Sequence, residues 1–307
     1  MLKQRILTAL VLLALLIPAV LWLPPTGWAA LISVIIGLAA WEWAGLAGYG
    51  KMGRIGYGVF VAGLLFGLCI IEWDSEARFL AFFLPCFWFC FAFWFVAVPL
   101  WLRFRWPLKG IPGLCVGLIV LLPAGFMAAI ADSQPANALL YGNYGKTTLL
   151  LILMIAWVAD TCAYFTGRKF GKHKLAPGIS PGKTWEGVAG AVAGVFLYLA
   201  SFFLILAHQN EQPDFTMFAI LLAVAFALAL VLTAVSVIGD LFESLLKRQA
   251  GVKDSSPLLP GHGGILDRID SLLALLPVVG ALTGALFLVF IWVWASAHRL
   301  SIIITPS

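Results

Sequence analysis

The sequence predicts an all-α, polytopic integral membrane protein with about nine transmembrane helices and a cytoplasmic N-terminus. Of its 307 residues, 63% are hydrophobic and 11% are charged, whereas a soluble globular chain is about 45–50% apolar and about 25% charged. The apolar residues form long continuous runs, unlike the alternating strands of a β-barrel. The composition therefore excludes a soluble enzyme, a disordered protein and a secreted disulfide scaffold.

Nine apolar runs in the sequence are close to the roughly 20 residues that a helix needs to cross the hydrocarbon core. They are Ile6–Trp22, Trp28–Ala47, Ile55–Ile71, Phe79–Leu102, Ile111–Ile130, Thr147–Phe165, Gly187–Ala207, Phe215–Ile238 and Ser271–Ser296. The first run follows two basic residues, as in a signal peptide, but no convincing small-residue cleavage site follows it, so we expect an uncleaved span. We divide the chain into an N-terminal region of about five spans, residues 1–146, and a catalytic region, residues 147–307. The catalytic region contains two cytoplasmic loops, 166–186 and 239–270.

The placement of the basic residues supports this count and orients the spans. With a cytoplasmic N-terminus and alternating spans, 16 of the 19 Lys and Arg residues fall in cytoplasmic segments, as the positive-inside rule requires. Arg78, Lys146 and Arg299 fall on the outer side, where we also expect the C-terminus. Because the basic residues are spread over several short loops, nucleic acid is not an expected partner.

One acid, Glu42, lies inside an apolar run of the N-terminal region. Acids within a membrane span are costly and are by default candidates for function. Glu42 is near the cytoplasmic end of its run, where it could reach the interface or pair with Lys51 or Arg54, so we favour a structural role.

The first polar connection follows Asp160, the only charge in its apolar run. Ser180 and Pro181 are typical of a helix N-cap and first helical position, which predicts that Lys183 and Thr184 lie in the first turn of a helix. A helix N-terminus beside a lysine is suited to phosphate. The segment is not a P-loop, because three residues separate its glycines instead of four and no strand precedes it. A basic juxtamembrane segment attracted to anionic lipid is the alternative.

The second connection begins inside the eighth apolar run. On a helix starting near Gly239, one face would carry the acids and bases that recur every three or four residues, namely Asp240, Glu243, Ser244 and Lys247. Gly251 is expected to end this helix, and a loop rich in Pro and Gly follows it. The paired glycines Gly263 and Gly264 would let backbone N–H groups approach an anion closely. A further helix is expected to begin near Ile265, with Asp267, Asp270 and Ser271 on one face.

These residue types favour phosphoryl or nucleotidyl transfer. Carboxylates from separate helices can hold Mg²⁺, and lysines and arginines beside them can neutralise a polyphosphate. Cys and His residues do not cluster in the sequence as they do in zinc sites. A nucleophilic triad of Ser244, His262 and Asp267 is conceivable, but nothing in the spacing favours it.

The segment Ser244–Asp270, called the signature segment below, resembles the signature of the phosphatidate cytidylyltransferase (CDP-diacylglycerol synthase) family. Its fixed positions are all filled, by Ser244, Lys247, Arg248, Lys253, Asp254, His262, Gly263, Gly264, Asp267, Arg268 and Asp270. Two upstream elements also resemble this family, from Asp160 to Gly167 and from Ser180 to Gly187. The first five spans contribute only hydrophobicity and count.

This resemblance implies a reaction in which CTP and phosphatidate give CDP-diacylglycerol and pyrophosphate, with Mg²⁺ required. Asp240 and Asp267 would be the first choices as metal ligands, with Asp160, Asp254 and Asp270 as further ligands or orienting groups. The CTP phosphates and the phosphatidate head group would be bound by basic side chains, namely Lys183, Lys247, Arg248, Lys253 and Arg268. Further hydrogen bonds would come from Ser180, Ser244, His262, Gly263 and Gly264, with Thr184 beside Lys183.

The resemblance also implies a bacterial inner-membrane protein with its active site on the cytoplasmic side, and a homodimer is compatible with it. A second metal or a monovalent cation stays open, as does dCTP in place of CTP. Two alternatives remain: a CTP-dependent transferase or kinase for another lipid, such as a polyprenol or archaeol, and a secondary transporter. Transporter sites lie near the bilayer midplane, whereas the acids here gather at the ends of spans.

Overall fold

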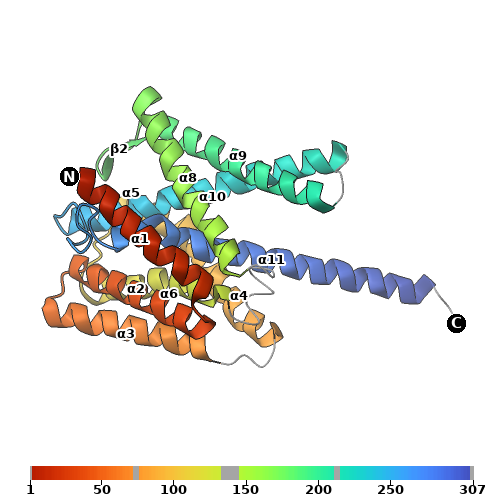
Figure 1. Ribbon diagram of the computed structural model, residues 1–307, viewed down its shortest axis with the longest axis horizontal. Coiled ribbons are helices and arrows are strands. Elements are labelled where there is room, and N and C mark those ends of the chain that lie inside the picture. Colours follow the sequence, from red (N-terminus) through yellow and green to blue (C-terminus); the bar gives the residue numbers. More distant parts are fainter. Residues whose placement is uncertain (1, 72–75, 133–144, 211–214, 305–307) are drawn as a thin grey trace.

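A computed structural model describes residues 2–71, 76–132, 145–210 and 215–304 as a bundle of long helices with one small β hairpin (Figure 1). The α-helices are α1 (Leu2–Trp22), α2 (Pro25–Leu46), α3 (Lys51–Ile70), α4 (Glu76–Ala92), α5 (Val98–Phe104), α6 (Gly110–Ala129), α8 (Lys146–Phe170), α9 (Trp185–Asn210), α10 (Phe215–Gln249) and α11 (Leu266–Ile304). A π-helical turn, η1 (Phe93–Ala97), joins α4 to α5, and a 3₁₀ turn, η2 (Ile130–Asp132), follows α6. The hairpin consists of β1 (Lys174–Ala176) and β2 (Ser180–Thr184).

Eight helices in the described part of the chain are long and apolar enough to cross a membrane, and they coincide with the second to ninth predicted runs. The predicted run Ile6–Trp22 lies within α1, which is not among these eight. An all-α polytopic fold is therefore supported. The count of nine spans, the cytoplasmic N-terminus and the division of the chain at residue 146 stay predictions.

Small residues let neighbouring helices approach closely, as is common between membrane helices. A Cβ at Gly37 of α2 would lie 2.7 Å from the Cβ of Ala62 on α3. Likewise, a Cβ at Gly194 of α9 would lie 2.4 Å from the sulfur of Cys162 on α8. The two helix pairs α2–α3 and α8–α9 are therefore packed through glycines on one partner.

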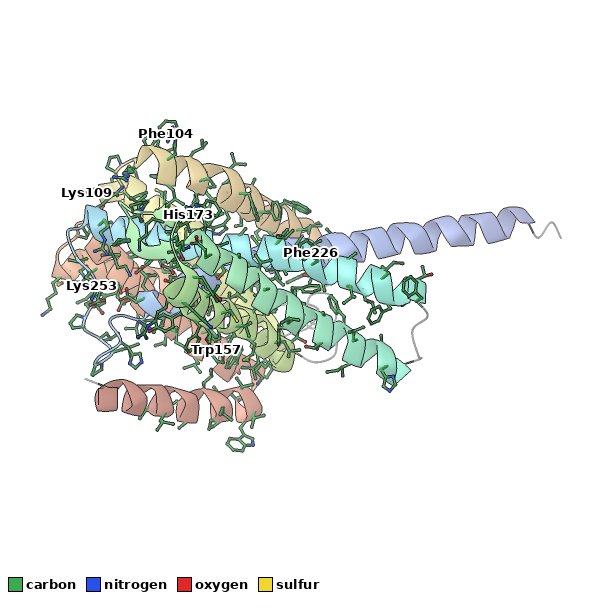
Figure 2. The ribbon with its side chains drawn as sticks, turned by 90° about the horizontal axis from the view of Figure 1, so that it is seen from above. Phe104, Lys109, Trp157, His173, Phe226 and Lys253 are labelled. Carbon is green, nitrogen blue, oxygen red and sulfur yellow. The ribbon has the colours of Figure 1, made fainter. Side chains whose placement is uncertain are left out.

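Both polar connections lie at one end of the bundle, called the loop end below. In Figure 1 the hairpin and the loop between α10 and α11 are at the same end, and α11 runs from there to the opposite end. Figure 2 shows Lys109 and Lys253 at this end, whereas Phe226, in the first half of α10, lies away from it. The fold therefore brings together two connections that are about 70 residues apart in the sequence.

An aromatic cluster supports α10 near the loop end. The Phe242 ring, which is 1% exposed, lies 6.3 Å from the Trp43 ring of α2, 5.9 Å from the Trp94 ring of η1 and 6.1 Å from the Trp101 ring of α5. The aromatic-rich fourth run thus packs inside the bundle at this point. Since Phe242 stands between the predicted site residues Asp240 and Ser244, the cluster fixes the helix that carries them.

Candidate active site

Three helices bring acids of the predicted site together at the loop end. Asp160 comes from α8, Asp240 from α10 and Asp270 from α11. The three carboxylates are close enough to interact electrostatically. This approach requires Gly239, because a Cβ there would stand 2.8 Å from the carbonyl oxygen of Asp270. The helix that was expected to start near Gly239 is instead a continuation of the span, and at Gly239 the backbone of α11 packs directly against α10.

Lys183 supplies positive charge to this acid cluster. Its Nζ lies 2.6 Å from Oδ2 of Asp240, and both side chains are about a quarter exposed, at 23% and 27%. Lys183 also interacts electrostatically with Asp160 and Asp270. The hydroxyl of Ser244 donates to Oδ1 of Asp240 at 3.3 Å. Because Lys183 belongs to β2, its ion pair fastens the hairpin to α10.

A second cluster surrounds Lys247. Its Nζ lies 2.5 Å from Oε2 of Glu243 on the same helix and 2.6 Å from Oδ1 of Asp267 on α11. The three side chains are 13%, 2% and 5% exposed. Charges with so little access to water need direct partners. Lys247 therefore joins the ends of α10 and α11 while it neutralises two carboxylates.

Asp267 also organises the loop between α10 and α11. Its Oδ2 accepts hydrogen bonds from the backbone N–H of Gly264 at 2.7 Å, and from the N–H and hydroxyl of Ser255 at 2.9 and 2.8 Å. Gly263 has φ +85°, and a Cβ on it would lie 2.7 Å from Oδ2 of Asp267. Gly264 thus donates its N–H to the carboxylate of Asp267, whereas the N–H of Gly263 donates to the carbonyl of Leu259 at 3.1 Å. Binding of a substrate anion by this glycine pair stays a prediction.

The other basic and histidine positions of the signature segment have separate contacts. Arg268 donates from Nη2 to the carbonyl of His262 at 2.7 Å and interacts with Asp160. Arg248 donates from Nε to the carbonyl of Ile179 at 3.2 Å, which links α10 to the hairpin turn. Lys253 is exposed on the loop.

Asp254 is also exposed. Its Cβ is close to Gly263, because a Cβ added to that glycine would lie 3.3 Å from it. The hydroxyl of Ser244 and the carboxylate of Asp267 bind Asp240 and Lys247, respectively. The contacts of these described residues therefore do not form the disfavoured Ser244–His262–Asp267 triad.

The predicted helix start at Ser180 is wrong. Residues 180–184 form β2, which pairs antiparallel with β1 through Ala176 and Ser180 and through Lys174 and Thr184. The helix begins at Trp185, and Thr184 is its cap, since Thr184 Oγ1 accepts the N–H of Gly187 at 3.1 Å. Ser and Thr are both good N-cap residues, and the strand pairing of residues 180–184 leaves Thr184 as the cap. Lys183 therefore reaches Asp240 from a strand.

The sequence comparisons agree with the signature segment. A sequence model of the cytidylyltransferase family matches residues 3–287. The chain belongs to the cytidylyltransferase family. It is 41% identical over 296 residues to a phosphatidate cytidylyltransferase of Pseudomonas aeruginosa, covering 93% of this chain and 98% of that protein. It is 34% identical over 291 residues to the protein of that name from Haemophilus influenzae, covering 90% and 96%. With the one from Thermotoga maritima it is 44% identical over 139 residues, covering 45% and 50%.

In this cytidylyltransferase the chemistry of the acid cluster fits a hard cation. Carboxylate oxygens from three helices are the donors that Mg²⁺ takes up in nucleotide-processing sites. Within the described ranges, however, no group of three or more His, Cys, Asp or Glu side chains converges on a single metal position. The Lys183 ammonium bonds to Asp240 instead. The donor set suits the ion, and Lys183 is the cation that the structure shows there.

Sequence reasoning about this family member missed the role of Glu42, Ser255 and Ser256. The Glu42 carboxylate lies against the α10–α11 loop and accepts hydrogen bonds from both serine hydroxyls. The expected partners were wrong, because Arg54 lies with its Cζ 3.7 Å from the centroid of the Trp41 ring and donates to the Trp41 carbonyl. An acid in a span was the signal for Glu42, whereas two serines after Asp254 carried no distinctive signal.

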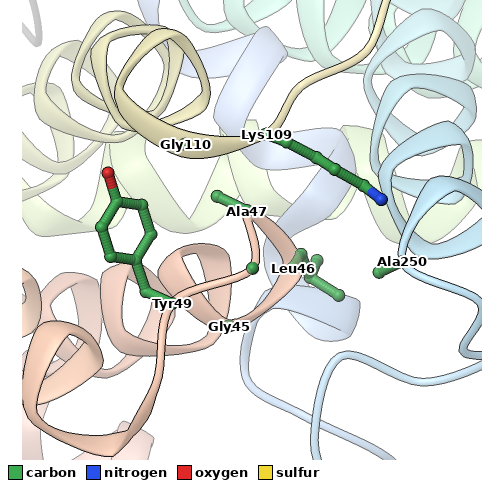
Figure 3. A pocket seen from close by; sticks show the side chains of 8 residues that line it. Gly45, Leu46, Ala47, Tyr49, Lys109, Gly110 and Ala250 are labelled. Carbon is green, nitrogen blue, oxygen red and sulfur yellow. The ribbon is translucent and has the colours of Figure 1, made fainter.

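A cavity of about 650 Å³ opens beside the site at the loop end (Figure 3). It is lined by residues of the α2–α3 turn, the start of α6 and the end of α10, namely Gly45, Leu46, Ala47, Gly48, Tyr49, Lys109, Gly110 and Ala250. In Figure 3 the Lys109 side chain extends across it toward Ala250. The lining contains no residue of the predicted site, so the cavity does not mark the acid clusters.

Proposed function

We propose that this chain transfers the cytidylyl group of CTP to phosphatidate, giving CDP-diacylglycerol and pyrophosphate in phospholipid biosynthesis. The observation that carries the proposal is the presence of two lysine–carboxylate clusters, Lys183–Asp240 and Lys247–Asp267, at one end of a bundle of apolar helices. The names of the relatives supply the substrate, since those proteins are phosphatidate cytidylyltransferases. Both lines lead to the same reaction class.

In the proposed reaction a phosphate oxygen of phosphatidate attacks the α-phosphorus of CTP, and the bond from that phosphorus to pyrophosphate breaks. A phosphate monoester has a second pKa of about 6, so the attacking oxygen is largely ionised and needs no dedicated base. The work left to the protein is to hold two anions together and to neutralise the leaving group. Lys183 and Lys247 are placed for this, because each already binds a carboxylate that a phosphate could replace.

Mg²⁺ is part of the proposal. Asp240 and Asp267 would hold it, with Asp160 and Asp270 as further ligands or orienting groups. Asp160, Asp240 and Asp270 approach one another from α8, α10 and α11, whereas Asp267 lies in the Lys247 cluster and would have to turn toward the ion. When bound, the ion would neutralise charge that develops on the phosphate oxygens. Arg248, Lys253 and Arg268 lie at the rim of the same end, where incoming phosphates would meet them.

The setting of the site suits two substrates of opposite solubility. We infer a multi-pass protein of a bacterial inner membrane, with nine spans and with the loop end on the cytoplasmic side. CTP would then arrive from water, and phosphatidate would enter sideways from the bilayer. A homodimer is compatible with this arrangement and stays a prediction.

Pyrophosphate release by the detergent-purified protein tests the proposal, with CTP, phosphatidate and Mg²⁺ each supplied and each omitted. We expect release only with all three, and loss of release with EDTA that excess Mg²⁺ restores. Folded protein that releases nothing with phosphatidate, but does so with a polyprenol or archaeol acceptor, would refute the lipid assignment. Release without added Mg²⁺ in the presence of EDTA would refute the metal site.

A further inference from the structure

Glu42 is a fully buried acid, 0% exposed, one turn before the end of α2. A carboxylate removed from water is destabilising unless hydrogen bonds replace its hydration. All four contacts that the structure gives to Glu42 come from the α10–α11 loop and the start of α11, 213 to 224 residues away in the sequence. The energetic reason for an acid here therefore lies in that loop.

The four contacts come from neutral donors and use both carboxylate oxygens. Oε1 accepts the Ser256 hydroxyl at 2.5 Å and the Ile265 N–H at 3.0 Å. Oε2 accepts the Leu266 N–H at 2.7 Å and the Ser255 hydroxyl at 3.1 Å. Leu266 is the first residue of α11, so the carboxylate caps the positive end of that helix dipole. Glu42 thus caps the start of α11 from a helix that is more than 200 residues away in the sequence.

Gly264 shows how closely Glu42 presses on the loop. A Cβ at this position would lie 2.4 Å from Oε1 of Glu42 and 2.0 Å from the Ser255 hydroxyl oxygen. Atoms cannot approach so closely without displacement of the backbone. The second glycine of the signature segment is therefore required by the Glu42 contact, in addition to donating its N–H to Asp267 at 2.7 Å.

Ser255 connects Glu42 to the site. Its hydroxyl oxygen lies 3.1 Å from Oε2 of Glu42 and 2.8 Å from Oδ2 of Asp267, so a single hydroxyl stands between the two carboxylates. Asp267 in turn bonds to Lys247 through its other oxygen at 2.6 Å. The single hydroxyl proton can be donated to only one of the two carboxylates at a time, but Ser255 lies within hydrogen-bond distance of both. A chain of contacts therefore runs from α2 through Ser255 to the lysine–carboxylate cluster.

The helix that carries Glu42 is firmly held. The next residue, Trp43, is 1% exposed and donates from Nε1 to the carbonyl of Gly113 on α6 at 2.8 Å. At the other end of α2, Trp28 donates to the carbonyl of Ala128 at 2.9 Å. An anchor on such a helix can define the position of a Gly- and Pro-rich loop that has little secondary structure of its own.

We propose that Glu42 is a positioning residue of the active site, which fixes the loop 255–265 and the N-terminus of α11 and, through Ser255, orients Asp267. For its effect on catalysis this inference rests on the proposed function. It predicts that replacement of Glu42 lowers turnover through the geometry of Asp267, without removing any group that touches a substrate.

The test compares Glu42→Gln, Ser255→Ala and the double variant with wild type. Glu42→Gln keeps the shape of the side chain but replaces one acceptor oxygen by a donor. Loss of groups that orient metal or substrate ligands commonly costs about 10–100-fold, and we expect kcat to fall by that factor in each single variant, with a smaller change in KM for CTP. The double variant should be little worse than either single one, because both interrupt the same chain.

Amide hydrogen exchange gives a readout that does not depend on activity. Exchange at Ile265 and Leu266 should accelerate in Glu42→Gln more than exchange at the amides of α2, and the melting temperature should fall by a few degrees, as expected for the loss of a buried cap. Ser33→Ala is the matched control, because Ser33 is a buried polar residue on the same helix whose hydroxyl donates to the Ala29 carbonyl at 2.7 Å. It should change neither kcat nor the exchange of these amides.

Two results would overturn the proposal: unchanged kcat per folded molecule in Glu42→Gln, or effects of Glu42→Gln and Ser255→Ala that multiply in the double variant. If Glu42→Gln does not fold, an unchanged kcat in Ser255→Ala would likewise overturn the proposal. Wild-type protein that releases no pyrophosphate would refute the proposed function instead. The exchange rates at Ile265 and Leu266 would still decide whether Glu42 holds the loop.

Discussion

Lys247 on α10 lies 2.6 Å from Asp267 on α11, and this ion pair closes the loop that carries most of the signature segment. The two residues are 20 positions apart, and the loop between them returns to the same point because Asp267 also binds the backbone of Ser255 and Gly264. A carboxylate that is proposed to bind metal and also holds its own loop would have two roles. Substitutions at this position should therefore change both activity and local order.

Asp267→Asn is the most direct test of the predicted metal and phosphate site. The amide keeps the size of the side chain but removes the negative charge that pairs with Lys247. Of the two carboxylates that Lys247 contacts, only that of Glu243 would remain. We expect kcat for pyrophosphate release to fall by about 100-fold. The Mg²⁺ concentration that gives half-maximal rate should rise in any residual activity. A fully active variant would show that Asp267 is not part of the site.

Lys183→Met tests the contribution of the hairpin. A hydrogen bond to a charged group contributes about 1.5–3 kcal/mol, so loss of one from Lys183 to a CTP phosphate should raise KM for CTP about tenfold or more. Initial rates at varied CTP concentration measure this. Lys174→Met is the matched control, because Lys174 is an exposed lysine on the neighbouring strand β1. If both variants raised KM for CTP equally, the net charge of the hairpin would determine CTP binding, and the position of Lys183 beside Asp240 would not.

Gly263→Ala should disturb the site through the backbone. Gly263 has φ +85°, and the new Cβ would come within 2.7 Å of Oδ2 of Asp267. The left-handed conformation alone costs a non-glycine residue about 1–2 kcal/mol. We expect a lower melting temperature and at least about a tenfold loss of kcat.

Gly56→Ala is the comparison for that variant. A Cβ on Gly56, within α3, would meet nothing within 4 Å. Alanine is a better helix former than glycine by up to about 1 kcal/mol. This variant should therefore be as stable as wild type or more stable, with unchanged activity. A similar loss in both variants would contradict the steric argument for Gly263.

The fold was predictable from the sequence to the extent that it depends on apolar length. Runs such as Phe215–Ile238 and Ile111–Ile130 are apolar over nearly the whole length of a helix. This property can be read from neighbouring residues alone, without knowledge of distant contacts. The end of α10 was also predictable, since Gly251, two residues beyond the last residue of the helix, has φ +74°. Helical spacing placed Glu243 and Lys247 on one face, and the structure pairs them. The ion pair of Lys247 with Asp267 was not predicted, because Lys247 was expected to bind phosphate and Asp267 to bind metal.

The remaining features depend on contacts that no local pattern encodes. The hairpin strand Ser180–Thr184 contains Pro and Gly, and its pairing with residues 174–176 is decided by a turn and by the ion pair of Lys183 with Asp240. The partners of Glu42 lie more than 200 residues away. From the sequence, nearby Lys51 and Arg54 were the reasonable partners, whereas in the folded chain Glu42 accepts backbone N–H groups at the start of α11.

The sequence predicted that Thr184 contacts the substrate, whereas in the structure Thr184 caps a helix. Its side chain is 5% exposed, and its hydroxyl accepts the N–H of Gly187 at 3.1 Å as the cap of α9. Loss of a threonine cap costs about 1 kcal/mol, so Thr184→Ala should lower the melting temperature by about 2–4 °C. Because the hydroxyl is committed to the helix, KM for CTP should stay within about twofold of wild type.

Thr184→Ser is the control that keeps the capping hydroxyl, and it should restore the melting temperature. The opposite pattern, with KM for CTP raised in Thr184→Ala at an unchanged melting temperature, would mean that the hydroxyl meets the nucleotide. In that case the hairpin must open away from α9 when CTP binds, since the same oxygen cannot serve both partners in the arrangement described here. The cap then becomes a contact of the substrate-free state, and the hairpin becomes the moving part of the site.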